Sequence, residues 1–279
     1  MSFAFGQATQ FDLAEIARFS RVMRTTGKSL HLVVLGQDMH TGHRVLLRTA
    51  KQLGVAVAAL ELPDDGALAP ESLEILRESG VDAVVAYTRK PGQPHSLWPQ
   101  GLRTQITAPA GLEDPAELAQ ALTTHLSLVH AVSPETIVAG EKDYEFLLRL
   151  QQAMTDLHLP VKVQGVPTVR MPDGLAMSLR NTQIPEEYRE PAMALSAALT
   201  AGAHVAERGG QAVVDTAAEV LQAAGVQPEY LQLRARDFGP APEQGDARLL
   251  VAASFGGVRL VDNVGVPVGI GFRNLDGDS

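Results

Sequence analysis

Two histidines that flank a threonine and a glycine, His40-Thr41-Gly42-His43, form the clearest chemical motif of this chain. The four residues follow a short apolar run and precede an amphipathic segment, so we expect them where a strand turns into a helix. A helix N-terminus favours anions, glycine permits close backbone approach, and imidazoles donate hydrogen bonds. The chain has eight histidines, so this spacing could arise by chance. The position after a strand favours phosphate binding.

A second polar motif, Gly140-Glu141-Lys142-Asp143-Tyr144, directly follows the apolar run at 136–140. A lysine at a strand end can neutralise phosphates as a point charge, and a neighbouring carboxylate can accept hydrogen bonds from ribose hydroxyls. Charged residues are also common in surface turns. Taken alone, this segment is more simply explained as a solvated turn.

The third motif runs from Pro167 through Arg170 and continues to Asn181. Ser178 and Arg180 are two residues apart in this irregular segment, so a hydroxyl and a guanidinium could both face one phosphate. A solvated turn is again the simpler explanation for the segment in isolation.

The elements expected to position these motifs alternate between strands and helices. Asp12 can cap a helix over 12–24, a buried strand follows over 30–36, and a helix over 39–54 closes at Gly54. The alternation continues through 55–62, 73–80, 81–87, 118–132, 136–140 and 144–157. This order predicts an α/β fold, a parallel sheet with helices on both faces, and ligands then bind outside the carboxyl ends of its strands.

The pattern changes after Pro167. Helical stretches over 190–207 and 211–224 are followed by strand candidates over 230–235 and 247–256. We therefore predict an α/β domain over 1–168, which the family resemblance given below identifies as Rossmann-like and nucleotide-binding, and a smaller α+β domain over 169–279. A Pro- and Gly-rich stretch between Lys90 and Asp114 is expected to be a long loop.

Composition narrows the class of protein. The 279 residues are 45% hydrophobic with a net charge of -9, and they contain no cysteine. No basic stretch interleaved with aromatics suggests nucleic acid, and no apolar run approaches the ~20 residues that span a membrane. The N-terminus lacks the pattern of a secretory signal. These features predict a cytoplasmic protein that acts on small molecules, with disulfides and Cys-based zinc sites excluded.

Together the three motifs resemble those of the pantoate-β-alanine ligase family, in the order H-x-G-H, G-E-K-D-Y and P-T-V-R-x-x-D-G-L-A-M-S-S-R-N. H-x-G-H is the hallmark of the wider nucleotidyltransferase superfamily. The segment 249–263 is similar to the family's C-terminal strand and its R-L-I-D-N ending. The resemblance implies a Rossmann-like domain with a small C-terminal lid, usually in a homodimer. It also implies a reaction in which ATP and pantoate form an adenylate that β-alanine then attacks.

The resemblance assigns residues to ATP, with Mg²⁺ held mainly by the nucleotide phosphates and no dedicated metal ligands. His40 and His43 would stabilise the reacting α-phosphate and the departing pyrophosphate, with His43 the better candidate for the acid. Lys142, Ser178 and Arg180 would hold phosphates. The remaining nucleotide contacts would come from Gly36, Gly42, Gly140, Asp143, Val169 and Met177, with Gly140 and Asp143 at the ribose and Val169 and Met177 at the adenine.

The acid-binding half departs from the family pattern. Residues 34–37 read V-L-G-Q where the family has P-T-M-G, and 60–65 replace a family segment that supplies an Asn and a Gln for pantoate. Glu145 and Phe146 stand where the family usually has two glutamines, the second of which binds pantoate. Leu179 replaces a serine, and the family's R-P-G-H-F is absent near 112–120.

These substitutions predict weak pantoate binding, because a site that recognises hydroxyls loses discrimination with its polar partners. The carboxylates of Glu61, Asp64 and Asp65 would also repel an anionic acid unless a cation intervenes. Three functions stay open from the sequence. The chain could be a divergent pantoate-β-alanine ligase, a paralogue that adenylates another acid, or a non-catalytic homologue that binds nucleotide.

Overall fold

The computed structural model describes residues 3–63 and 66–270. The chain divides into two compact units, residues 1–168 and 169–279, and each is considered by itself. None of the helices within the described ranges combines the length and the apolar character needed to cross a membrane.

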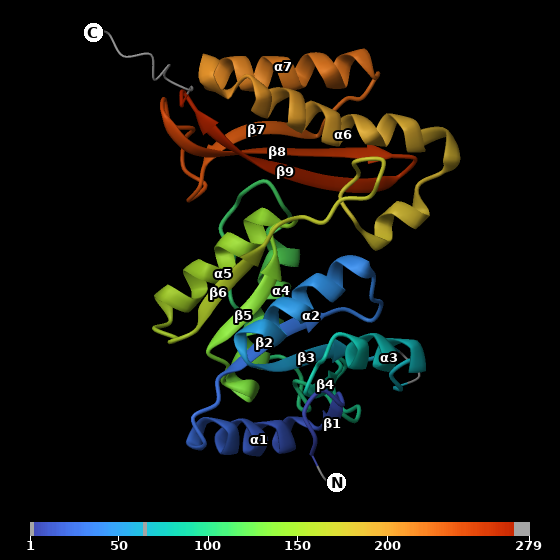
Figure 1. Ribbon diagram of the computed structural model, residues 1–279, viewed down its shortest axis with the longest axis vertical. Coiled ribbons are helices and arrows are strands. Elements are labelled where there is room, and N and C mark those ends of the chain that lie inside the picture. Colours follow the sequence, from blue (N-terminus) through green and yellow to red (C-terminus); the bar gives the residue numbers. More distant parts are fainter. Residues whose placement is uncertain (1–2, 64–65, 271–279) are drawn as a thin grey trace, which may run out of the picture. The chain divides into compact units, whose positions relative to one another are not determined.

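The first unit is built on a six-stranded, all-parallel sheet with strand order β1-β4-β3-β2-β5-β6 (Figure 1). The strands are β1 (Thr9–Phe11), β2 (Leu30–Leu35), β3 (Val55–Glu61), β4 (Ala83–Tyr87), β5 (Thr136–Gly140) and β6 (Lys162–Val166). The parallel sheet predicted from the alternation of elements is confirmed, and so is the Rossmann-like fold that the resemblance implied. β1 and β6 were not predicted, because β1 has only three residues and β6 alternates exposed polar with partly buried positions instead of forming an apolar run.

Helices cover both faces of this sheet. The connecting helices are α1 (Leu13–Thr25), α2 (Thr41–Leu53), α3 (Pro70–Glu78), α4 (Pro115–Val132) and α5 (Tyr144–Asp156). Leu47 and Leu76 from α2 and α3 pack on one face with Leu60. α1, α4 and α5 pack on the other face, where Ile16 and Leu122 are buried. The central strands are apolar on both sides for this reason.

Local capping signals set the helix starts. Asp12 accepts a hydrogen bond from the backbone N–H of Glu15 at 2.7 Å, which confirms the cap predicted for α1. α2 begins at Thr41, two residues later than expected, because His40 occupies its N-cap position. The loop predicted between Lys90 and Asp114 contains no helix or strand. Asp114, the last residue of this loop, caps the N-terminus of α4.

The second unit is an antiparallel three-stranded sheet with two helices on it. This is the smaller α+β domain that the sequence predicts. Its strands and helices are β7 (Tyr230–Ala235), β8 (Gly245–Phe255), β9 (Val258–Val268), α6 (Glu186–His204) and α7 (Gly210–Ala223), with short 3-10 turns η1 (Leu179–Gln183) and η2 (Ala206–Arg208). Leu199, Leu221 and Leu249 belong to its core, and α6 and α7 lie against one another (Figure 1).

Several boundaries in the second unit differ from the sequence prediction, by one or two residues in α7 and β8 and by more in α6. α6 begins at Glu186 instead of 190 and includes Pro191 in its second turn, where the missing N–H removes a single helical hydrogen bond. It ends at His204 instead of 207, because Val205 leaves the helix before η2 begins. The structure also adds β9, which follows directly after the tight turn at Gly256 and Gly257.

Candidate active site

His40 and His43 form a compact pair at the start of α2. The backbone N–H of Gly42 donates to Nδ1 of His40 at 3.1 Å, and the N–H of His40 donates to Nδ1 of His43 at 3.3 Å. The two rings stack with their centroids 3.8 Å apart. Because each Nδ1 accepts a hydrogen bond, the proton of each neutral ring lies on Nε2.

Burial controls the charge of this pair. Burial, followed by the neighbouring His40, lowers the pKa of His43 from 6.5 to about 4. Burial, followed by the charge of Lys142, also lowers the pKa of His40. Both rings are therefore suited to donate hydrogen bonds from Nε2 as neutral groups. At pH 7 His43 is thus a neutral hydrogen-bond donor, and the prediction that it acts as the acid stays a prediction.

Lys142 lies beside this pair because of the sheet topology. β2 and β5 are parallel neighbours, so their carboxyl ends place the α2 start and the residues after Gly140 at the same edge. The Lys142 side chain is only 17% exposed, and its Nζ lies 3.8 Å from Oδ1 of Asp143. The structure thus brings together the first two motifs, whose histidines and lysine are about a hundred positions apart in the chain.

Two glycines of the predicted nucleotide site end or follow these strands. Gly140 is the last residue of β5, and Gly36 directly follows β2. A Cβ added at either position would meet no atom within 4 Å. Neither glycine is therefore required by packing, and both border open space at the carboxyl edge of the sheet.

From Val169 onward the third motif belongs to the second unit, where some of its residues stabilise the segment and others are the predicted ligands. The guanidinium of Arg170 forms two hydrogen bonds, of 2.7 and 3.1 Å, to the carboxylate of Asp262, which is 4% exposed. The buried Asn181 donates to the carbonyl of Ala176 at 3.0 Å. Arg170, Asn181 and Asp262 therefore support the irregular segment between β6 and α6.

The other residues of this motif are the predicted nucleotide ligands Val169, Met177, Ser178 and Arg180. Ser178 accepts from the N–H of Arg180 at 3.2 Å and so caps η1, while the Arg180 side chain is exposed. The N–H of Met177 donates to the carbonyl of Val169 at 2.8 Å, which holds the two predicted adenine contacts together. Within this unit Val169, Met177, Ser178 and Arg180 belong to one segment, in which Ser178 caps the turn that begins before Arg180.

Glu145 is a structural residue whose role sequence reasoning missed. Its carboxylate is nearly fully buried and accepts from the N–H groups of Leu112 and Glu113 at 2.8 and 3.0 Å. Arg149 donates to its other oxygen at 3.2 Å. A Cβ at Gly111 would overlap this carboxylate. The first turn of α5 is thereby tied to the segment that enters α4, and the Glu145-Arg149 spacing of four was the available signal.

The substituted carboxylate Glu61 is paired. Arg89 donates from Nε to Oε1 of Glu61 at 2.7 Å, and the hydroxyl of Tyr87 donates to the carbonyl of Leu35 at 3.4 Å. Burial, and secondarily the charge of Glu61, raises the pKa of Tyr87, which stays protonated. The predicted repulsion of an anionic acid by Glu61 is therefore offset by Arg89. Asp64 and Asp65 lie outside the described residues.

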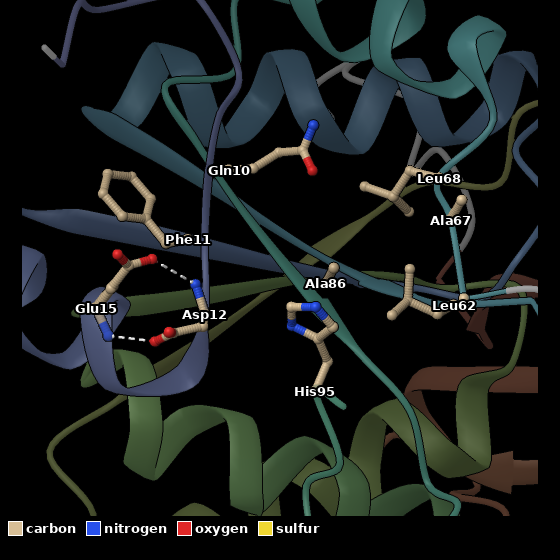
Figure 2. A pocket seen from close by; sticks show the side chains of 10 residues that line it. Gln10, Phe11, Asp12, Glu15, Leu62, Ala67, Leu68, Ala86 and His95 are labelled. Atoms are coloured by element: carbon tan, nitrogen blue, oxygen red, sulfur yellow. Dashed lines mark hydrogen bonds between the residues drawn. The ribbon is translucent and has the colours of Figure 1, made fainter. Parts of the chain in front are cut away.

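A pocket of about 470 Å³ opens at the carboxyl ends of β1, β4 and β3 (Figure 2). It borders Leu62 in the substituted segment, and His95 and Gln10 point toward it. Its two carboxylates, Asp12 and Glu15, are engaged in the capping box of α1. None of the predicted site residues lines this pocket, so it is not assigned to the nucleotide.

Comparisons with known proteins agree with the geometry. The family model described as pantoate-beta-alanine ligase matches residues 69–265. A pantothenate synthetase from Corynebacterium jeikeium is 41% identical over 297 aligned positions, which cover 99% of this chain and 95% of the relative. The structure of pantothenate synthetase from Thermus thermophilus has a TM-score of 0.77 at 27% identity, covering 92% of this chain and 98% of that one.

A more distant solved structure shows the same fold. It is pantoate-beta-alanine ligase from Francisella tularensis, complexed with β-γ ATP and β-alanine. The TM-score is 0.67 at 21% identity, with 92% of this chain and 97% of that chain covered.

Proposed function

The chain belongs to the pantoate-β-alanine ligase family, and on that premise we propose that it is an ATP-dependent ligase that joins pantoate to β-alanine through an acyl adenylate. The observation that carries this proposal is the pair of neutral imidazoles beside Lys142 at the carboxyl edge of the sheet. Two Nε2–H donors and one ammonium are suited to a polyphosphate in a protein whose net charge is negative.

In the first step, a carboxylate oxygen of pantoate attacks the α-phosphorus of ATP. The bond from that phosphorus to the bridging oxygen breaks, and pyrophosphate leaves with the electron pair. His40 and His43 stabilise the charge that develops on the phosphate oxygens by hydrogen bonding, and Lys142 neutralises the departing pyrophosphate. Because their tautomers are set before substrate arrives, the rings do not need to reorganise during the reaction.

In the second step, the unprotonated amine of β-alanine attacks the acyl carbon. The bond from that carbon to the phosphate oxygen breaks, AMP leaves with the electron pair, and the amine releases a proton to water. No described side chain needs to form a covalent bond in either step. Catalysis then rests on positioning and electrostatic stabilisation.

The finer assignments follow the family pattern. Ser178 and Arg180 would contact phosphates, Gly36 and Gly42 would offer close backbone approach, Gly140 and Asp143 would take the ribose, and Val169 and Met177 would bound the adenine. ATP enters as its Mg²⁺ complex, with the metal held mainly by the phosphates and by water, as this ion prefers. A cytoplasmic homodimer is the assembly that we propose.

An oxygen-transfer experiment tests the chemistry directly. With pantoate labelled with ¹⁸O in its carboxylate, one labelled oxygen should appear in AMP, because the attacking oxygen stays on the phosphorus. Mass spectrometry of AMP and pyrophosphate measures this. Pantoate-dependent formation of ADP and phosphate, or AMP without label, would contradict the proposal.

A second candidate function, adenylation of a different acid, is favoured by Leu35, Leu62 and Phe146 in place of family polar groups. Pyrophosphate release with a panel of small hydroxy acids separates the two. Faster release with another acid than with pantoate would favour this second function.

A further inference from the structure

An uncharged histidine lies next to the residue that replaces the family glutamine. His125 on α4 contacts Phe146 on α5, with ring centroids 4.7 Å apart and an interplanar angle of 58°. Phe146 is in the first turn of α5, four positions after Lys142. His125 therefore contacts a residue that follows Lys142 by four positions in the chain.

The backbone determines the tautomer of His125. Its Nδ1 lies 2.7 Å from the carbonyl oxygen of Ala121, one helical turn earlier in α4. A carbonyl oxygen only accepts, so Nδ1 carries the proton and Nε2 has a bare lone pair. Burial lowers the pKa of His125 to about 4, so the ring stays neutral at physiological pH. Nε2 is then an acceptor throughout the working pH range.

This acceptor is available for a ligand. His125 as a whole residue is half-buried, and no side chain or backbone group of the described residues donates a hydrogen bond to Nε2. An acceptor in a largely apolar environment loses free energy when it is unpaired. Phe146 cannot supply a donor. A hydroxyl group of a bound molecule can, whereas a second carboxylate would be repelled by the lone pair.

We propose that Nε2 of His125 accepts a hydrogen bond from the hydroxyl at the far end of the acid substrate, which is the 4-hydroxyl of pantoate under the proposed function. The carboxylate of the acid must face the α-phosphate near His40, His43 and Lys142. Phe146 lies in the first turn of α5, after Lys142, and His125 contacts it, so under this proposal a four-carbon acid whose carboxylate faces Lys142 extends toward these two side chains. His125 is then a specificity-determining residue that moves hydroxyl recognition from α5 to α4.

The test combines a variant with a substrate that lacks the hydroxyl. Pyrophosphate release is measured with pantoate and with 2-hydroxy-3,3-dimethylbutanoate, for the wild type and His125→Leu. We expect the wild type to prefer pantoate about tenfold in kcat/KM, and His125→Leu to lose most of that preference through a higher KM for pantoate. The KM for ATP and for β-alanine should change less than about twofold, since the proposal assigns His125 to the hydroxyl of the acid alone.

Two further variants separate recognition from packing. His125→Gln keeps an acceptor and should retain a clear part of the preference for pantoate, and it replaces His125→Leu if the latter does not fold. Adding Phe146→Gln to His125→Leu should restore the preference by returning an amide to α5.

A wild type that treats both acids alike overturns the inference without any variant, as does a His125→Leu enzyme with unchanged preference. If the wild type releases no pyrophosphate with pantoate, the proposed function fails as well. Selective failure of the His125 series in an active enzyme overturns only the inference.

Discussion

The two histidine sites of the first unit have opposite tautomers. At the start of α2, backbone N–H groups donate to Nδ1 of His40 and His43, so both rings present an N–H donor. On α4, Nδ1 of His125 donates to a carbonyl, so that ring presents an acceptor. All three pKa values are lowered by burial. The backbone partner of a neutral imidazole thus decides whether it suits a phosphate or a hydroxyl.

The two sites also differ in how they are built. The α2 pair is held by hydrogen bonds between residues two and three positions apart, which form together with the helix. The region of Phe146 and His125 depends on α4 and α5 being held together, partly by the Glu145 contacts to residues 33 and 32 positions away. The first site should therefore be locally robust and the second sensitive to tertiary packing.

The largest expected effect comes from the donor pair. His43→Leu removes one Nε2–H from the reacting phosphate, so kcat/KM should fall about 10²-fold or more with every acid tested. Pyrophosphate release measures it. His130→Leu, which replaces an exposed imidazole on α4, is the matched control and should keep full activity. If the loss at His43 depended strongly on which acid is used, the division between the two sites would be wrong.

The next largest effect is expected on the free energy of unfolding, from changes at Glu145, which holds the start of α5 against residues 112–113. Glu145→Leu leaves Arg149 and two loop N–H groups without this carboxylate and should cost about 3 kcal/mol of the free energy of unfolding. Denaturant titration measures the change. Glu145→Gln keeps the shape and one acceptor oxygen, so its loss should be smaller. Equal losses in the two variants would show that charge alone, and not the clamp to residues 112–113, stabilises this region.

The pH dependence of stability compares both sites at once. His43 and His125 bind protons with a pKa near 4 in the folded chain and near the ordinary 6.5 when unfolded. Between these values the unfolded state binds more protons, so the free energy of unfolding should fall as the pH drops from 6.5 to 4. Above pH 6.5 the two groups contribute no slope.

Denaturant titrations at several pH values test this, with His125→Leu and His43→Leu each expected to flatten the slope. His130→Leu is again the control. An unchanged slope in both site variants would contradict the lowered pKa values.

The smallest effect is expected from Phe146→Gln alone. His125 keeps its acceptor in this variant, so the KM for pantoate should change less than about fivefold. Steady-state kinetics measure it. A larger gain in affinity would mean that Phe146 blocks a hydroxyl site instead of covering one.

Features that depend on residues close together in the chain were well predicted from the sequence. The parallel sheet, the Asp12 cap, the helix after His40 and the family followed from local patterns and recognisable order. The pairing of Glu61 with Arg89 and the clamp by Glu145 did not, because each joins residues 28 or more positions apart. The predicted role of Asp143 and the predicted contacts by Ser178 and Arg180 stay predictions.

By itself, the sequence determined the orientation of His40 and His43, because the hydrogen bonds that orient them lie within four consecutive residues and form with the helix. Only the tertiary structure decided that Lys142 adjoins them and that His125 meets Phe146. Those encounters depend on the order of strands in the sheet and on how α4 packs against α5. Packing between distant segments has no local pattern from which it could be predicted.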